Sequence, residues 1–313
     1  MTCSRKGCSV FCVGLALQDT ILTLDRIPDR AAKVYAKGRR EVGGGPAATA
    51  AVTVARLGGH ASIAARTGED NIGATIRDEF EAAGVDTAWL RAFPGIRSSG
   101  AVVLVDSSGE RLIVAYADPE LPSAANWLEP EDWGDAVLCD LTWPEGALRG
   151  LNAAQAAGIP SVLDADISRH AAGTVAAIVD AAGHVIFSRP GLTQFTGTES
   201  IEEGLRIARR PSHIFVGVTD GADGLFWLED GELRNAPPPS VDVVDTTGAG
   251  DAFHGAFALA LAHGRPIADA IVFSNTVAAL KCTRPGGRAG LPDPAALCDF
   301  APELDLDWLM VGA

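Results

Sequence analysis

The chain has 313 residues, of which 47% are hydrophobic and 21% charged, a balance that is typical of a folded globular protein and excludes wholesale disorder. Its formal net charge of −15 argues against nucleic acid and anionic membranes as partners, because both require basic patches. No stretch approaches the roughly 18 to 20 apolar residues of a membrane span, so no membrane partner is expected. The six cysteines form no CxxC pair, which favours free thiols in a reducing cytoplasm.

The N-terminal third predicts one core strand and a small separate sheet. Residues 10–17 are expected to form the first buried strand, which Asp19 would end. Short polar strands are expected at 21–24 and 34–36. A hairpin is expected from 100–105 and 111–116, with its turn at 106–109. Strands this short and polar are typical of a sheet that stands off the main domain.

A helix of small residues is expected between these strands. Gly43, Gly44 and Gly45 precede it, alanines dominate residues 47–57, and Gly58 and Gly59 end it. A helix this thin can pack closely on a sheet.

The rest of the chain alternates strands and helices in regular order. Strands are expected at 61–65, 136–140, 161–164, 184–188 and 213–219, and helices at 71–83, 148–157, 174–182 and 201–208. Such βαβ units predict a parallel sheet covered by helices. Ligands of such sheets lie beyond the carboxyl ends of the strands. The polar residues expected at such ends should therefore ring one crevice; they are Asp19, Asp140, Asp164, Thr219 and Asp245.

The stretch 241–264 combines a strand, a glycine turn and a helix. The β-branched run 241–244 is expected to be a buried strand, and the helix begins near Asp251. Gly248 and Gly250 lack a Cβ, so a phosphate could approach the backbone where unpaired helix N–H groups point outward. Asp251 could then act as a general base toward a hydroxyl. A tight connection with Asp251 as a capping acid explains the spacing equally well.

Two motifs carry a resemblance to a known family. DTTGAGDAFHGAF at 245–257 and GGGPAATAAVTVARLGG at 43–59 resemble the two signatures of the ribokinase-like (PfkB) carbohydrate kinases. The resemblance extends nearly end to end. It implies an α/β fold with three α/β/α layers, a mainly parallel sheet and one domain over 1–313. A small β-sheet from about 20–40 and 97–117 would form a lid over the sugar and join two subunits in a homodimer.

The resemblance also implies an ATP-dependent sugar kinase that uses Mg²⁺. Asp251 would be the base, and the backbone of Gly248, Ala249 and Gly250 would hold the γ-phosphate. Sugar would bind at Asp19 and at Gly43, Gly44 and Gly45. Lys33 in the lid could meet an anionic substituent of the sugar, or remain a solvated surface lysine.

The nucleotide and cation sites follow from the same resemblance. The nucleotide would contact Thr219, Gly221, Gly224, Gly248 and Gly250, with Asn275 lining the adenine site. Asp245 and Thr247, with the glycine-rich loop 281–290, could bind a monovalent cation such as K⁺, although such a loop could also simply turn.

Several positions depart from the family pattern. Gly45 and Ala48 stand where many relatives carry asparagine, and 188–191 replaces an Asn-x-x-Glu motif, so Mg²⁺ would be held mainly by ATP oxygens and water. Arg189 within it could touch phosphate. The chain looks most like the sulfofructose kinases of this family, yet Ala115 and Thr142 replace their sulfonate-binding asparagine and arginine.

These departures leave the substrate open. A ketohexose-type sugar or derivative, of the fructose and sulfofructose class, is expected. The alternatives are a pentose, a nucleoside, a keto-deoxy sugar acid, or a non-catalytic sugar-sensing protein on the same fold.

Overall fold

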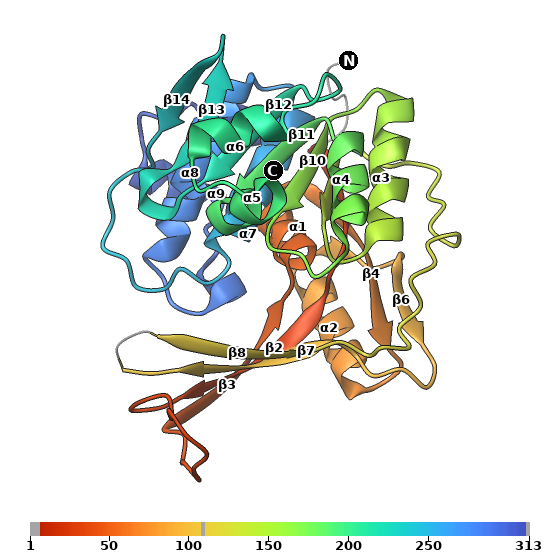
Figure 1. The fold of residues 1–313 in the computed structure, drawn as a ribbon, viewed down its shortest axis with the longest axis vertical. Helices are drawn as coiled ribbons and strands as arrows, with labels where there is room; N and C mark the ends of the chain where they lie inside the picture. Colours follow the sequence, from red (N-terminus) through yellow and green to blue (C-terminus); the bar gives the residue numbers. More distant parts are fainter. Residues whose placement is uncertain (1–6, 108–109, 311–313) are drawn as a thin grey trace.

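The computed structural model describes residues 7–107 and 110–310 (Figure 1). The strands of this part are β1 Ser9–Val13, β2 Leu17–Thr23, β3 Gly38–Gly44, β4 His60–Gly68, β5 Val85–Asp86, β6 Leu90–Phe93, β7 Gly100–Val105, β8 Arg111–Tyr116, β9 Ala136–Asp140, β10 Ser161–Ala165, β11 His184–Ser188, β12 Phe215–Thr219, β13 Leu225–Glu229 and β14 Glu232–Ala236. The helices are α1 Pro46–Arg56, α2 Asn71–Ala82, α3 Pro144–Ala157, α4 Ala172–Ala181, α5 Arg189–Thr196, α6 Ile201–Ala208, α7 Ala249–Ala262, α8 Ile267–Cys282, α9 Pro294–Phe300 and α10 Asp307–Met310, with short 3₁₀ turns η1 Gly221–Asp223 and η2 Gly287–Gly290.

The main sheet is mostly parallel and is covered by helices on both faces. Its strand order is β14-β13-β12-β11-β10-β9-β1-β4-β5, and β6 pairs with β4. Only the pairs β12–β13 and β13–β14 are antiparallel among the described strands of this sheet. One core cluster packs the sheet against α1, α2, α7, α8 and α9, and the other packs it against α3 to α6. The predicted three-layer α/β/α fold is therefore confirmed.

The central strands are buried and consist mostly of apolar residues. Every residue of β9 and β10 is buried, including Asp140 at the end of β9 and Asp164 one residue before the end of β10. Such continuous runs are what a parallel sheet with two covered faces requires. The sequence pattern therefore predicted these strands well.

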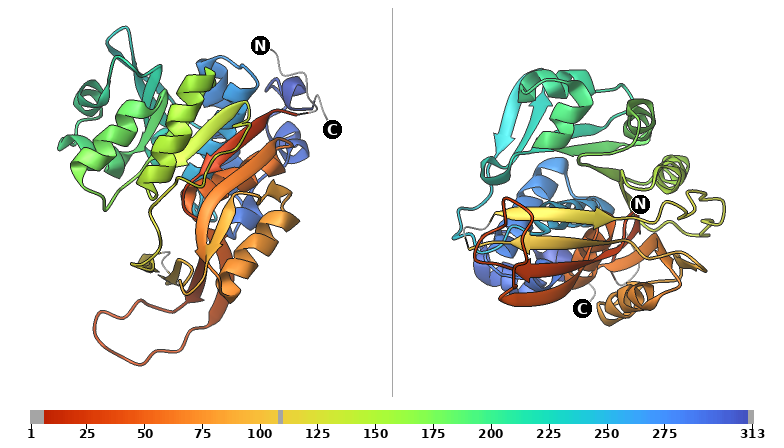
Figure 2. Two further views of the ribbon diagram at one scale, coloured as in Figure 1. Left: turned by 90° about the vertical axis from the view of Figure 1, so that its right-hand side faces the viewer. Right: turned by 60° about the horizontal axis from the view of Figure 1, so that its bottom comes forward.

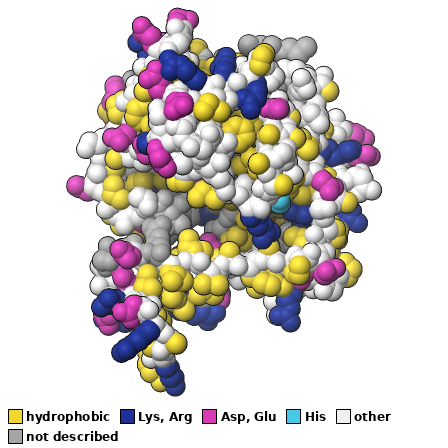
Figure 3. All heavy atoms as spheres, in the orientation of Figure 1, with side chains coloured by type: hydrophobic (Ala, Val, Ile, Leu, Met, Phe, Trp, Pro, Cys, Tyr) yellow, Lys and Arg dark blue, Asp and Glu magenta, His cyan; other side chains and the backbone are white. Residues whose placement is uncertain are grey.

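The second sheet has the order β3-β2-β7-β8 and projects from one end of the main body (Figures 1 and 2). The expected hairpin of β7 and β8 is antiparallel, whereas Ser108 and Gly109 of its turn lie outside the described residues. Exposed apolar side chains gather on this small sheet (Figure 3). They include Val102, Leu112, Ile113, Val114 and Tyr116.

The prediction of one strand over 10–17 was wrong. β1 ends at Val13, and the chain re-enters a strand only at Leu17, now in the small sheet. At the break, a Cβ on Gly14 would lie 2.1 Å from Asp140 Oδ2. Leu15 N–H donates to that same oxygen at 2.9 Å, so the carboxylate turns the chain out of the main sheet. Asp19 consequently lies within β2 instead of ending a core strand.

The partner strand of β2 also differs from the prediction. The expected strand at 34–36 is exposed and irregular, and β3 runs from Gly38 to Gly44. Antiparallel pairing of Leu17 with Gly44 through Thr23 with Gly38 sets this position. Gly43 and Gly44 therefore end a strand, and Gly45 alone precedes α1.

The expected strand at 241–244 is absent. Val243 and Val244 are 62% and 60% exposed, so this β-branched run is not buried. Three prolines at 237–239 lead into it, and proline lacks the N–H that a sheet needs. The N–H of Val244 donates to the Cys282 carbonyl at 2.8 Å, at the end of α8, instead of to a neighbouring strand.

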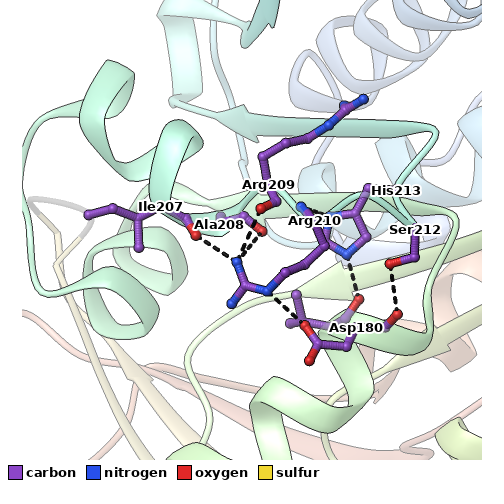
Figure 4. Close-up of polar contacts among 8 residues, drawn as sticks. Asp180, Ile207, Ala208, Arg209, Arg210, Ser212 and His213 are labelled. Carbon is purple, nitrogen blue, oxygen red and sulfur yellow. Dashed lines mark hydrogen bonds and ion pairs between the residues drawn. The ribbon is translucent and has the colours of Figure 1, made fainter.

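The turn after α6 is anchored on α4 by side chains (Figure 4). Arg210 Nε donates to Asp180 Oδ1 at 3.0 Å. His213 Nδ1 accepts the Arg210 backbone N–H at 3.1 Å, and its Nε2 lies 2.9 Å from the Val179 carbonyl. These two contacts specify a neutral ring protonated at Nε2. Burial also lowers the pKa of His213.

Candidate active site

The carboxyl ends of the central strands bring together three of the five predicted polar residues, whereas Asp19 lies within β2 and Asp245 follows no strand. Asp140, Asp164 and Thr219 end or nearly end β9, β10 and β12, as expected. Asp140 is a structural hub there, because its Oδ2 accepts the N–H groups of Leu15 and Ala47, at 2.9 and 3.1 Å. This carboxylate joins the end of β1 to the first turn of α1.

The first turn of α7 carries the candidate base at this edge. Gly248 is the N-cap with φ +76°, a conformation that favours glycine. The backbone at Gly250 does not require glycine, since its φ is not positive and a Cβ there would meet nothing within 4 Å. Gly250 also lines a cavity beside this helix end. Its missing side chain therefore leaves room for a ligand beside helix N–H groups that lack intrahelical acceptors.

Asp251 is half-buried next to this glycine. Burial raises the pKa of Asp251 to about 7, and the nearby Asp164 and Asp140 carboxylates raise it as well, whereas His254 and Arg288 lower it. A carboxylate with this pKa exchanges a proton readily near neutral pH, as a general base must.

Asp164 and His254 form a buried pair behind Asp251. Asp164 Oδ2 lies 3.3 Å from His254 Nδ1. The same nitrogen is 2.8 Å from the Gly250 carbonyl, and Nε2 is 3.3 Å from the Ile186 carbonyl. Burial and the neighbouring Asp166 and Asp140 raise the pKa of Asp164 well above its usual value. His254 thus ties the first turn of α7 to β10 and β11.

A cavity of about 540 Å³ adjoins the α7 N-terminus. Its lining includes residues predicted to contact the nucleotide, namely Thr219, Gly221, Gly224, Gly250 and Asn275. The Asn275 side chain is not directed freely at a ligand, because its Nδ2 donates to the Ala236 carbonyl at 2.8 Å. Gly248 lies outside the lining, at the helix cap.

Other wall residues were not identified from the sequence. They come from the segment after β14 and from α7 and α8, namely Pro238, Pro239, Ser240, Val241, Val243, Phe253, Ala278, Ala279 and Cys282. Apart from Ser240 these residues are apolar, and the run 241–244 was interpreted as a buried strand. Only the packing of α8 against this segment makes these residues a wall.

Apart from Lys33, the predicted sugar residues lie around a largely buried arginine that the sequence did not single out. Arg288 of η2 donates from Nη2 to the Gly44 carbonyl at 2.7 Å and from Nε to Thr49 Oγ1 at 3.3 Å. Its Nη1 lies 3.7 Å from Glu79 Oε2. Burial lowers the pKa of Arg288 to about 10, while Glu79, Asp251 and Asp19 oppose this shift.

Close contacts explain why glycine occupies positions 43 to 45. A Cβ on Gly43 would lie 2.1 Å from Arg288 Nη1, and one on Gly44 would lie 2.6 Å from Asp19 Oδ2. Gly45, with φ +99°, would place a Cβ 2.2 Å from the Leu15 carbonyl. The glycine run therefore lets the Arg288 and Asp19 side chains close on the backbone. Burial raises the pKa of Asp19, and Arg288 opposes the shift.

Two other residues predicted to contact ligands, Lys33 and Arg189, do not lie among the residues around Arg288. Lys33 lies in the exposed segment between β2 and β3, with its Nζ 5.3 Å from the Tyr35 ring centre. Arg189, considered for phosphate, pairs with Asp220 at 2.6 Å and donates to the Glu199 carbonyl at 2.9 Å.

The predicted cation residues are engaged with protein groups. Asp245 Oδ1 accepts the Thr247 N–H at 2.9 Å, and Oδ2 accepts the Gly286 N–H at 2.8 Å. Although burial opposes the shift, these bonds lower the pKa of Asp245 well below its usual value. The carbonyl of Asp245 accepts a bond from Lys281 Nζ at 2.7 Å. Within residues 7–107 and 110–310, no group of three or more His, Cys, Asp or Glu side chains is placed to hold a metal ion.

Comparison with known proteins identifies the family. Residues 8–294 match the model of the pfkB family carbohydrate kinases. The chain belongs to this family. It is therefore an ATP-dependent carbohydrate kinase, as the two sequence signatures implied, and the fold of the structure agrees with this assignment.

Relatives of the kinase differ in the sugar that they are named for. It is 28% identical over 284 residues to the ribokinase of Bacillus subtilis (strain 168), which covers 90% of this chain and 94% of the relative. A structure from Agrobacterium tumefaciens, provisionally named a ribokinase, matches with a TM-score of 0.88 at 37% identity and covers 97% of this chain and 99% of that one. A fructokinase double mutant from Vibrio cholerae O395, solved with fructose, ADP and potassium ion bound, matches with a TM-score of 0.79 at 26% identity and covers 95% and 99% of the two chains.

No helix in the described part of the kinase has both the length and the apolarity to cross a membrane.

Proposed function

We propose that the kinase transfers the γ-phosphoryl group of ATP to a primary hydroxyl of a ketohexose-type sugar or derivative, with Asp251 as general base. The observation that carries this proposal is the juxtaposition of Asp251 with Gly250. The carboxylate, with a pKa of about 7, lies beside a glycine that opens into a cavity at a helix N-terminus. A base and an anion site thus meet at one point.

The reaction follows from this arrangement. The backbone at Gly248, Ala249 and Gly250 holds the γ-phosphate, while the nucleotide occupies the cavity lined by Thr219, Gly221, Gly224 and Asn275. Asp251 takes the proton of the sugar hydroxyl, whose oxygen bonds to the γ-phosphorus as the bond to the bridging oxygen of ADP breaks. Mg²⁺, held mainly by phosphate oxygens and water, would neutralise charge on the transferred group.

The sugar is proposed to bind between Asp19, the Gly43–Gly45 backbone and Asp251. Carboxylate oxygens suit vicinal hydroxyls, since they accept two hydrogen bonds at once. Sulfofructose stays within the proposal because a guanidinium does reach the region of Thr142. Arg66 lies 4.5 Å from the centre of the adjacent Trp143 ring. Its Nη1 donates to the Pro122 carbonyl at 2.7 Å.

Two further assignments complete the proposal. The exposed apolar side chains of β7 and β8 and the edges of the small sheet favour a homodimer through this lid. The free thiols of Cys12, Cys139, Cys282 and Cys298, among the described residues, favour the cytoplasm.

An ADP-release assay with ATP and Mg²⁺ tests the function. The panel contains fructose, sulfofructose, fructose 6-phosphate, ribose, tagatose, 2-keto-3-deoxygluconate and inosine. Asp251→Asn should reduce turnover by roughly 10²- to 10⁴-fold, the usual contribution of a general base. Asp242→Asn, an exposed carboxylate nearby, is the matched control and should retain full turnover. Preference for ribose or inosine would replace the ketohexose assignment. Full turnover in Asp251→Asn would refute the role of Asp251.

A further inference from the structure

Lys281 is a fully buried lysine close to the phosphate-binding segment. It lies in the last turn of α8 with none of its surface exposed. Its Nζ donates to the Asp245 carbonyl at 2.7 Å, and its positive charge helps to lower the pKa of the Asp245 carboxylate. Burying an ammonium group is costly unless polar groups receive it, so this placement is specific.

This contact holds the start of the segment that leads into α7. The Cys282 carbonyl accepts the N–H groups of Val244 and Asp245, at 2.8 and 3.1 Å. Asp245 in turn fixes Thr247 and Gly286 through its carboxylate. The end of α8 therefore positions residues 244–247, directly before the Gly248 cap. Any shift here would move the N–H groups that face the γ-phosphate.

The same place is where family resemblance implies a monovalent cation, and the related Vibrio cholerae fructokinase is described with potassium ion bound. K⁺ in proteins is held by oxygen atoms, carbonyls above all, that replace its water shell. Here the Asp245 carbonyl already receives the Lys281 ammonium group, and both carboxylate oxygens receive N–H groups. A second positive ion at that carbonyl would be repelled at short range. The residues present do not fit a K⁺ ion there.

We propose that Lys281 is a positioning residue that supplies, as a tethered ammonium group, the positive charge that other members of the family take from a monovalent cation. The kinase then needs no K⁺. The ammonium group offers three N–H donors from a fixed position, so it can order the 245–248 segment at every salt composition. The kinetic part of the test rests on the proposed function, whereas the stability part does not.

The test compares the wild type with Lys281→Ala, Lys281→Met and the control Lys37→Ala. Lys37 is an exposed lysine of the lid region that pairs with Asp25 at 2.5 Å. ADP release and thermal unfolding are measured in tetramethylammonium buffer, and again with K⁺ or methylammonium added at constant ionic strength. Lys281→Ala leaves a cavity for a small cation, while Lys281→Met fills the same space without charge.

Adding K⁺ should change the turnover of the wild type and of Lys37→Ala by less than about twofold, since Lys281 already supplies the positive charge. Lys281→Ala should lose about 10- to 100-fold in turnover, the size expected for one charge-assisted hydrogen bond. K⁺ or methylammonium should restore much of this loss and raise the unfolding temperature of Lys281→Ala alone. Lys281→Met should be impaired and should not respond to cations.

Two results would overturn the proposal. One is a wild type that K⁺ activates many-fold or stabilises against unfolding. The other is a Lys281→Ala protein with full, cation-independent turnover. If Lys281→Ala fails to fold, the wild type and Lys281→Met decide, since the proposal requires insensitivity to K⁺ in both. If no sugar is turned over by the wild type, the unfolding temperatures still test Lys281, so the two proposals fail separately.

Discussion

Replacing Arg288 with glutamine should change both the pH profile of the kinase and its affinity for sugar. Arg288 lowers the pKa of Asp251, which burial, Asp164 and Asp140 raise to about 7. An adjacent opposite charge moves a carboxyl pKa by about 1 to 3. With the smallest such change, the ionised fraction of Asp251 at pH 7 would fall from about one half to about one tenth. kcat/KM at pH 7 should then fall about fivefold from ionisation alone.

A second loss comes from geometry. Arg288→Gln removes the charge-assisted hydrogen bond to the Gly44 carbonyl, and bonds of this kind contribute about 1.5 to 3 kcal/mol. The glycine end of β3 should therefore loosen, and KM for the sugar should rise about tenfold or more. Arg288→Lys keeps the positive charge but lacks the planar guanidinium with its several N–H donors. It should therefore share this KM increase without the change in the pH profile.

The assay is the pH dependence of kcat/KM, whose acid limb reports the free-enzyme pKa of the base. Glu79→Gln is the matched control, because it breaks the same ion pair but leaves the positive charge beside Asp251. The acid limb should move to higher pH by about 1 pH unit in Arg288→Gln only. An unmoved limb in Arg288→Gln, in a folded protein, would refute the reasoning.

Three further predictions follow from single positions. Gly250→Ala should leave the unfolding temperature unchanged, since its Cβ would meet nothing within 4 Å of the protein. It should lower turnover by about 10-fold or more, because the Cβ would crowd the phosphate. Equal losses of stability and turnover would contradict this prediction. Gly43→Ala should displace Arg288, destabilise the fold by about 1 to 3 kcal/mol in urea unfolding and raise KM for the sugar, whereas Gly38→Ala on the same strand, with ordinary contacts at 3.6 Å, should do neither. The pKa of His213 is lower in the folded protein than in the unfolded chain, so the unfolded chain binds more protons in acid. The free energy of unfolding should decline as pH falls through about 6.5, and less steeply in His213→Asn; identical slopes would show that His213 does not titrate on unfolding.

Local chemistry explains which parts of the site the sequence predicted. The turn at Gly248 and the helix that carries Asp251 are encoded by adjacent residues, since a positive φ favours glycine and the apolar spacing defines the helix. The strand-end residues Asp140, Asp164 and Thr219 were predicted for a similar reason, because a run of apolar residues ends at each. These features need no knowledge of distant partners.

The wrong predictions share one cause, which is dependence on partners far away in the chain. The break after Val13 depends on the Asp140 carboxylate, 126 positions later by the numbering of Gly14 and Asp140. The segment 241–244 has the composition of a strand, yet its backbone bonds go to the end of α8. Arg288 was missed because a glycine-rich loop indicates only a turn until Glu79, Gly44 and Thr49 are seen around it.

By itself, the sequence determined the α/β class, the order of the βαβ units, the kinase family and the position of the candidate base, because each rests on periodicity or on a short motif. Only the tertiary structure decided the charge environment of that base. Asp251, Arg288 and Lys281 owe their properties to burial and to carboxylates and carbonyls from distant segments. Desolvation and Coulomb interactions depend on distance in space, which a linear pattern of residues does not contain.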